Sequence, residues 1–124
     1  MADITIDELL ANARAGLDRV DPKDLDEAHE DWALVVDTLT GEQRDRDGEL
    51  PGALVIDRTV LEWRLAPSSP YRSVDVEPDQ QVILVCTEGY SSSLAAATLQ
   101  ELGVNATDVV GGYRAWRAHL EGQS

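Results

Sequence analysis

The sequence has one cysteine, Cys86, among its 124 residues. A single thiol cannot close a disulfide within the chain, which excludes a disulfide-stapled secreted domain and is compatible with a reducing compartment. Phenylalanine is absent, and no apolar run is long enough to cross a membrane. Residues 1–5 lack the basic and apolar regions of a signal peptide. We therefore expect a cytoplasmic protein.

Positive charge is also scarce. The chain has 24 acidic residues against ten lysines and arginines, a formal net charge of −14. Such a surface repels nucleic acid and anionic membranes, so we expect neither as a partner. His29 and His119 lie in acidic or terminal stretches and are interpreted as solvated residues. No ligand cluster suggests a metal, and no cofactor is expected.

The most informative stretch begins with the apolar run VILV at residues 82–85, which is typical of a strand buried on both faces of a parallel sheet. Cys86 follows, and a short polar loop leads into a helix that Gly103 ends. Ser91 to Ser93 are its N-cap candidates. Its packed face is expected to comprise Leu94, Thr98, Leu99 and Leu102.

The flanking segments alternate between strand and helix patterns. Further strands are expected over residues 17–20, 33–36, 53–56 and 106–110. Further helices are expected from a capping box at Thr5–Glu8 to Gly16, over 23–30 and 59–65 with Asp21 and Asp57 as N-caps, and over 113–120. Residues 40–47 predict a short helix or an ordered loop, and residues 67–80 a surface excursion. This order predicts a single α/β domain over residues 1–124, with a central parallel sheet of about five strands and helices on both faces.

The position of Cys86 favours a reactive thiol. Parallel α/β sheets bind ligands at the carboxyl ends of their strands, where Asp37 and Gly111-Gly112 are also expected. Backbone N–H groups and the helix dipole would lower the pKa of a thiol there and make it a nucleophile. The alternative is a buried, inert core cysteine.

Four segments resemble motifs of the rhodanese family, in family order and spacing. Residues 86–92 read CTEGYSS and resemble the loop C-x-x-G-x-[ST/R]-[SA]. The strand LVVD at 34–37, the turn GELPGA at 48–53 and the segment VVGGYRAW at 109–116 resemble three further family motifs. Together they resemble the single-domain members, from about Asp31 to the C-terminus.

The resemblance implies a sulfurtransferase that moves a sulfane sulfur from a donor such as thiosulfate to a thiol or cyanide-type acceptor. Cys86 would carry the sulfur as a persulfide. The backbone N–H groups that would bind the anion belong to Thr87, Glu88, Gly89, Tyr90, Ser91 and Ser92, and Gly89 would allow an unusual backbone angle.

Two departures from the family pattern bear on the substrate. Many members carry a basic residue in the loop, where this chain has Glu88, and the strand ending at Asp37 lacks the arginine that commonly follows. Positive charge for substrate binding could come from Arg58 or Arg64. The alternative interpretation of both arginines is a surface ion pair with Glu62 or Asp57.

Two other functions stay open at this point. One is a rhodanese-like sulfur-carrier or protein-binding module with little turnover, which the acidic Glu88 favours. The other is a phosphatase or arsenate reductase, which requires a C-x5-R loop whose arginine binds the oxyanion. The residue six after Cys86 is Ser92, which argues against this second function.

Overall fold

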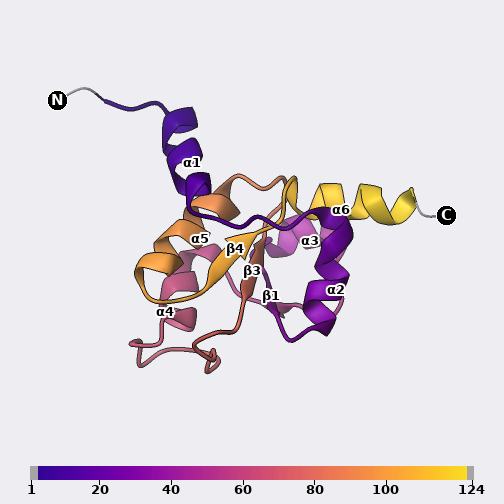
Figure 1. Ribbon diagram of the computed structural model, residues 1–124. Helices are drawn as coiled ribbons and strands as arrows, with labels where there is room; N and C mark the ends of the chain where they lie inside the picture. Colours follow the sequence, from indigo (N-terminus) through magenta and orange to yellow (C-terminus); the bar gives the residue numbers. More distant parts are fainter. Residues whose placement is uncertain (1–2, 123–124) are drawn as a thin grey trace.

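The computed structural model of the protein describes residues 3–122 (Figure 1). Within this range, helices and strands alternate along most of the chain. Their order is α1 (Ile6–Ala15), the 3₁₀ turn η1 (Pro22–Asp24), α2 (Leu25–Glu30), β1 (Leu34–Asp37), α3 (Gly41–Asp47), β2 (Leu54–Val55), the 3₁₀ turn η2 (Arg58–Val60), α4 (Leu61–Leu65), β3 (Val82–Val85), α5 (Ser91–Glu101), β4 (Ala106–Asp108) and α6 (Gly112–Glu121). None of the described helices is both long and apolar enough to cross a membrane.

The parallel sheet has the strand order β2-β1-β3-β4. Its four described strands correct the expected number of about five. The segment predicted as a fifth strand, residues 17–20, contributes only an isolated bridge between Val20 and Val109. Pairing ends there because Pro22 has no N–H to donate and begins η1 instead.

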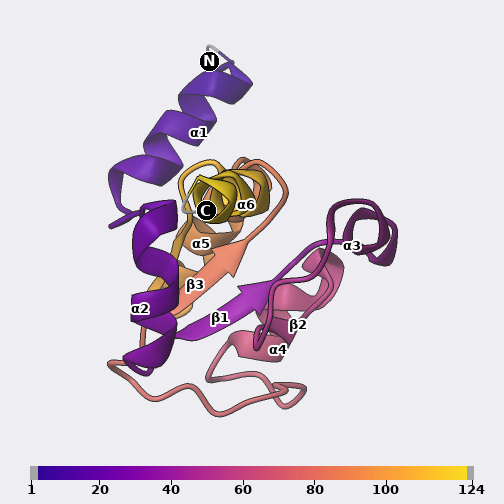
Figure 2. The ribbon, with the colours of Figure 1, turned by 90° about the vertical axis from the view of Figure 1, so that its right-hand side faces the viewer.

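Helices cover both faces of the sheet, as predicted. Side chains of β3 alternate between two cores: Val82 and Leu84 pack with Leu99 of α5, and Ile83 and Val85 pack with Trp116 of α6. In Figures 1 and 2 the two central strands β1 and β3 run side by side between these layers. The strands therefore end on a common rim, where Cys86 directly follows β3.

The predicted packing of α5 is wrong in two respects. The N-cap residue is Tyr90, and the serines form the first helical turn, where the hydroxyls of Ser92 and Ser93 each donate to Asp108 at 2.7 Å. These bonds turn the small residues toward the sheet. The buried positions are Ser92, Ser93, Ala95, Ala96 and Leu99, whereas Leu102 is 40% exposed.

Helix α1 begins with the predicted capping box, in which Thr5 and Glu8 exchange hydrogen bonds. None of its residues is buried, and the helix lies against the outer side of α5 (Figure 1). The N-cap predicted at Asp57 is confirmed, because its carboxylate accepts from the N–H of Thr59. The GGYRAW segment likewise begins α6.

The contrast between Leu84 of β3 and Leu102, just after α5, provides a stability test. Leu84 is fully buried beneath α5, so Leu84→Ala should lower the free energy of unfolding by about 2–5 kcal/mol through the cavity it creates. The control Leu102→Ala should cost less than about 1 kcal/mol. Urea denaturation measures both, and equal losses would contradict the burial of Leu84 and the exposure of Leu102 described above.

Candidate active site

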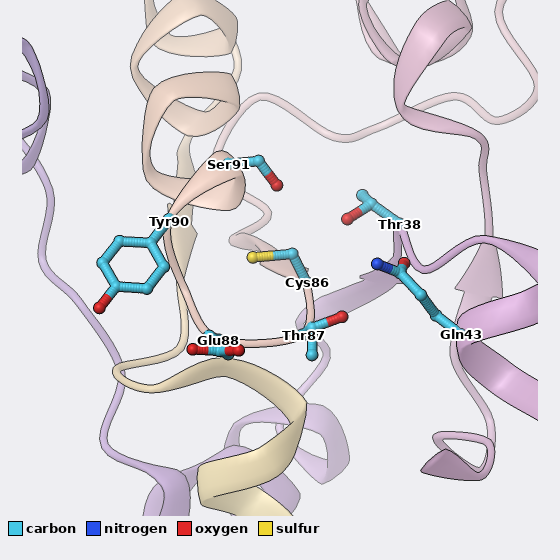
Figure 3. Close-up of a pocket in the computed structure, with 7 residues that line it drawn as sticks. All are labelled: Thr38, Gln43, Cys86, Thr87, Glu88, Tyr90 and Ser91. Atoms are coloured by element: carbon cyan, nitrogen blue, oxygen red, sulfur yellow. The ribbon is translucent and has the colours of Figure 1, made fainter. Parts of the chain in front are cut away.

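A pocket of about 290 Å³ opens beside Cys86 at the carboxyl ends of β1 and β3. The side chains of its lining residues surround the opening in Figure 3. They are Thr38, Gln43, Cys86, Thr87, Glu88, Tyr90 and Ser91. Cys86 itself is only 7% exposed, so its sulfur is partly desolvated yet borders the pocket.

Two backbone N–H groups and one hydroxyl surround the Cys86 sulfur. The N–H of Gly89 lies 3.2 Å and that of Ser92 3.4 Å from Sγ, while Ser92 Oγ lies 3.1 Å from it. Of the six residues predicted to bind the anion, these two contact the sulfur. The other four (Thr87, Glu88, Tyr90 and Ser91) line the pocket.

Helix α6 holds the loop in this conformation. The N–H of Tyr113 donates to Cys86 O at 2.8 Å, and the N–H of Arg114 donates to Thr87 O at 3.1 Å. These are first-turn N–H groups that lack partners within their own helix. Contact between the two segments is close, since a Cβ on Gly112 would lie 2.4 Å from Cys86 O.

A second group of donors holds the loop at Gly89, which has the positive φ of 84° that favours glycine. Its carbonyl accepts from Arg14 Nη2 at 2.7 Å and from Arg19 Nη2 at 3.2 Å. Because a trans peptide points its N–H opposite to its C=O, the held carbonyls turn the N–H groups of Thr87, Glu88 and Tyr90 away from these donors. All three residues line the pocket.

Asp108 forms a buried polar centre behind the sulfur. Its side chain is fully buried at the end of β4, and it accepts from the hydroxyls of Ser92 and Ser93. Arg19 donates to both carboxylate oxygens, at 2.7 and 3.2 Å. Asp108 was not predicted, because the strand was expected to continue to Val110; a strand that ends at Asp108 would have placed this carboxylate on the rim.

Three further residues near the pocket lie in the segment from the end of β1 into α3. Asp37 anchors that segment, as its Oδ1 accepts from the N–H of Leu39 at 2.8 Å; burial raises the pKa of Asp37 and this bond opposes the rise. Thr38 and Gln43 line the pocket and were not predicted. The spacing of Thr40 and Gln43 was a usable signal, because their capping box fixes the Gln43 side chain.

The pKa of the Cys86 thiol lies below its ordinary value. Burial raises it, whereas hydrogen bonding with the side chains of Ser92 and Ser91 and with the N–H groups of Ser92 and Gly89 lowers it by more. Desolvation disfavours the thiolate, whereas donors aimed at the sulfur favour it. The net effect favours a thiolate.

Two charged residues singled out from the sequence, Glu88 and Arg58, are both paired. Glu88, half exposed at the pocket, accepts from Arg114 Nη1 at 2.9 Å. Arg58 donates to both oxygens of Glu62, at 2.9 and 3.1 Å, and is not among the residues that line the pocket. This pair matches the alternative interpretation of Arg58, whose role in substrate binding stays a prediction.

The described residues contain no group of three or more histidines, cysteines, aspartates and glutamates placed to hold a metal ion. They also leave the buried hydroxyl of Thr87 without a hydrogen-bond partner. A buried hydroxyl without a partner is uncommon in folded proteins.

Solved structures of similar fold come from several bacteria. A Rhodopseudomonas palustris protein of unknown function, described as a possible tyrosine phosphatase, is 28% identical with a TM-score of 0.81, covering 96% of this chain and 93% of its own. A rhodanese-like domain protein from Staphylococcus aureus is 21% identical, with a TM-score of 0.63 and coverages of 79% and 89%. A thiosulfate sulfurtransferase from Pseudomonas aeruginosa is 23% identical with a TM-score of 0.66, covering 83% of this chain but only 18% of its own.

No curated protein gave a match. The profile of the rhodanese-like domain matches residues 21–119, which include β1, the Cys86 loop and most of α6. The fold, the loop and the family profile agree, and the chain belongs to the rhodanese-like domain family.

Proposed function

We propose that the protein is a sulfurtransferase whose nucleophile is Cys86. The observation that carries this proposal is the convergence of the Gly89 and Ser92 N–H groups on the Cys86 sulfur beside an open pocket. Such donors favour the thiolate form, which is the nucleophile in reactions of cysteine. The thiolate would attack the sulfane sulfur of a donor such as thiosulfate, forming a new S–S bond as the donor's S–S bond breaks and sulfite leaves.

The second half of the reaction returns the enzyme to its starting state. A thiophilic acceptor such as cyanide or a thiol attacks the outer sulfur, and the S–S bond to Cys86 breaks with its electron pair returning to the thiolate. The outer sulfur would lie in the pocket, among Thr87, Glu88, Tyr90 and Ser91. The N–H groups of the loop are the donors available to it.

Phosphatase chemistry has less support in the residues around the sulfur. The R. palustris protein of similar fold is described as a possible tyrosine phosphatase. A C-x5-R phosphatase needs an arginine at the position of Ser92, whose hydroxyl instead donates to the carboxylate of Asp108. Without an arginine at this position, the loop lacks the guanidinium that binds the phosphate dianion in such enzymes.

The first prediction concerns sulfur uptake. After incubation with thiosulfate, the intact mass should increase by one sulfur atom, and cyanide should remove that atom as thiocyanate. Cys86→Ser should abolish both changes because the chain has no other thiol. A Cys86→Ser protein that turns over normally would refute the proposal. Uptake without release to any acceptor would favour the sulfur-carrier module.

The second prediction concerns the acidity of Cys86. The pH midpoint of its alkylation should lie below the free-thiol value of about 8.5. Ser92→Ala should raise the midpoint by about one to two pH units, the value of a hydrogen bond to a charged group. The control Ser68→Ala removes an exposed hydroxyl from residues 67–80 and should leave it unchanged. A native midpoint at or above about 8.5 would favour an inert module.

The third prediction separates the two arginines. Arg114→Ala should raise KM for thiosulfate about two- to fivefold, because it leaves Glu88 unpaired at the pocket and an exposed pair is worth up to ~1 kcal/mol. Glu88→Gln should lower KM. Arg58→Ala should raise KM less than Arg114→Ala, since Glu62 already neutralises Arg58. Steady-state kinetics at fixed ionic strength measure all three variants, and a larger effect at Arg58 would reverse this assignment.

A further inference from the structure

Two arginines reach the Cys86 loop from a part of the chain that precedes the family match. The rhodanese-like profile begins at residue 21, whereas Arg14 lies at the end of α1 and Arg19 in the segment that follows. Both donate to Gly89 O, and Arg14 Nε also donates to Ser93 Oγ at 3.1 Å. Arg19 alone also binds the buried Asp108, through two bonds.

The hydroxyl of Ser92 links Cys86 to Asp108 through two hydrogen bonds. In the thiol form, the Cys86 S–H donates to Ser92 Oγ, and the Ser92 O–H donates to Asp108 Oδ2. A thiolate has no hydrogen to donate, so it competes with Asp108 for the single hydrogen of Ser92. The hydroxyl of Ser93 lies 2.7 Å from Asp108 Oδ2 and 3.1 Å from Gly89 O. It can therefore keep its hydrogen bond to the nearer acceptor, Asp108.

Two negative groups would therefore lie one hydroxyl apart whenever Cys86 is ionised. Buried like charges at this separation raise the pKa of the weaker acid strongly. Arg19 prevents this, because its side chain is only 16% exposed and its guanidinium binds both oxygens of a fully buried carboxylate. A bidentate pair in such an environment neutralises the carboxylate better than an exposed pair would.

Other charged groups near Cys86 do not take over this role. Glu88 is paired with Arg114 of α6, and the ring of Tyr90 lies under the guanidinium of Arg14 at 5.6 Å. Asp37 on β1 is directed to the N–H of Leu39. Arg14 also donates to Ser93 Oγ and Gly89 O, but the carboxylate of Asp108 takes both of its guanidinium hydrogen bonds from Arg19. The pair of Arg19 and Asp108 therefore balances the charge behind the sulfur.

We propose that Arg19 is a positioning residue for the sulfur chemistry. It neutralises Asp108, so that the carboxylate can hold Ser92 and Ser93 in place without opposing the Cys86 thiolate. The segment before the family match would thus cancel the negative charge that Asp108 places behind the sulfur. This inference rests on the proposed role of Cys86 as the nucleophile.

The test is the pH midpoint of Cys86 alkylation by iodoacetamide in the native protein and four variants. Arg19→Gln should raise the midpoint by about one to two pH units, because Asp108 loses its counter-ion. Asp108→Asn should lower it, because Arg19 then faces the thiolate without a balancing carboxylate. The double variant should return close to the native midpoint. Arg117→Gln, which removes an exposed charge on α6, should leave the midpoint unchanged.

A merely structural role for the pair predicts a different pattern. Loss of loop order would move both single variants and the double variant in one direction, toward the free-thiol value of about 8.5. A raised midpoint in Asp108→Asn, or an unchanged one in Arg19→Gln, would therefore overturn the proposal. If Arg19→Gln does not fold, Asp108→Asn alone decides by the direction of its shift.

The outcome is separable from that of the proposed function. Sulfur uptake by the native protein, measured by intact mass, tests Cys86 as the nucleophile and does not depend on Arg19. Normal uptake combined with unshifted midpoints would leave the sulfurtransferase proposal intact and refute the role of Arg19. Absent uptake combined with the expected shifts would refute the sulfurtransferase and leave the charge balance at Cys86 standing.

Discussion

The hydrogen bonds from the first turn of α6 to the carbonyls of Cys86 and Thr87 fix the conformation on which the site depends. They hold one side of the loop, and Arg14 and Arg19 hold another at Gly89 O. Because these carbonyls are held by donors outside the loop, the N–H groups of the same peptides point the other way, toward the pocket. The close packing of Gly112 against this backbone explains why a glycine pair follows β4.

The charged groups near the Cys86 sulfur are paired, although the chain as a whole is strongly negative. The net charge of −14 belongs largely to exposed carboxylates, whose fields are screened within about 8 Å at physiological salt. Close to the loop, Arg114 pairs with Glu88 and Arg19 with Asp108. The groups that touch the sulfur are neutral donors, and their effect is screened little because the thiol is buried. An acidic protein can therefore still hold a thiolate.

Local sequence patterns predicted much of this arrangement. The apolar run before Cys86, the positive φ of Gly89 and the N-cap at Asp57 each follow from a few neighbouring residues. The pairing of Arg19 with Asp108 could not be predicted, because the two lie 89 positions apart and meet only through the fold. For the same reason Ser92 and Ser93 were expected to cap α5, the role that serines play when no buried carboxylate competes for them.

Donors that converge on the Cys86 sulfur should keep it ionised at neutral pH, and the proposed chemistry depends on this. Because the chain has one cysteine, the ultraviolet absorbance of its thiolate can be isolated by subtracting the spectrum of Cys86→Ser at each pH. We expect this absorbance to be largely developed already at neutral pH. Absorbance that appears only at or above about pH 8.5, where a free thiol ionises, would contradict the role of these donors.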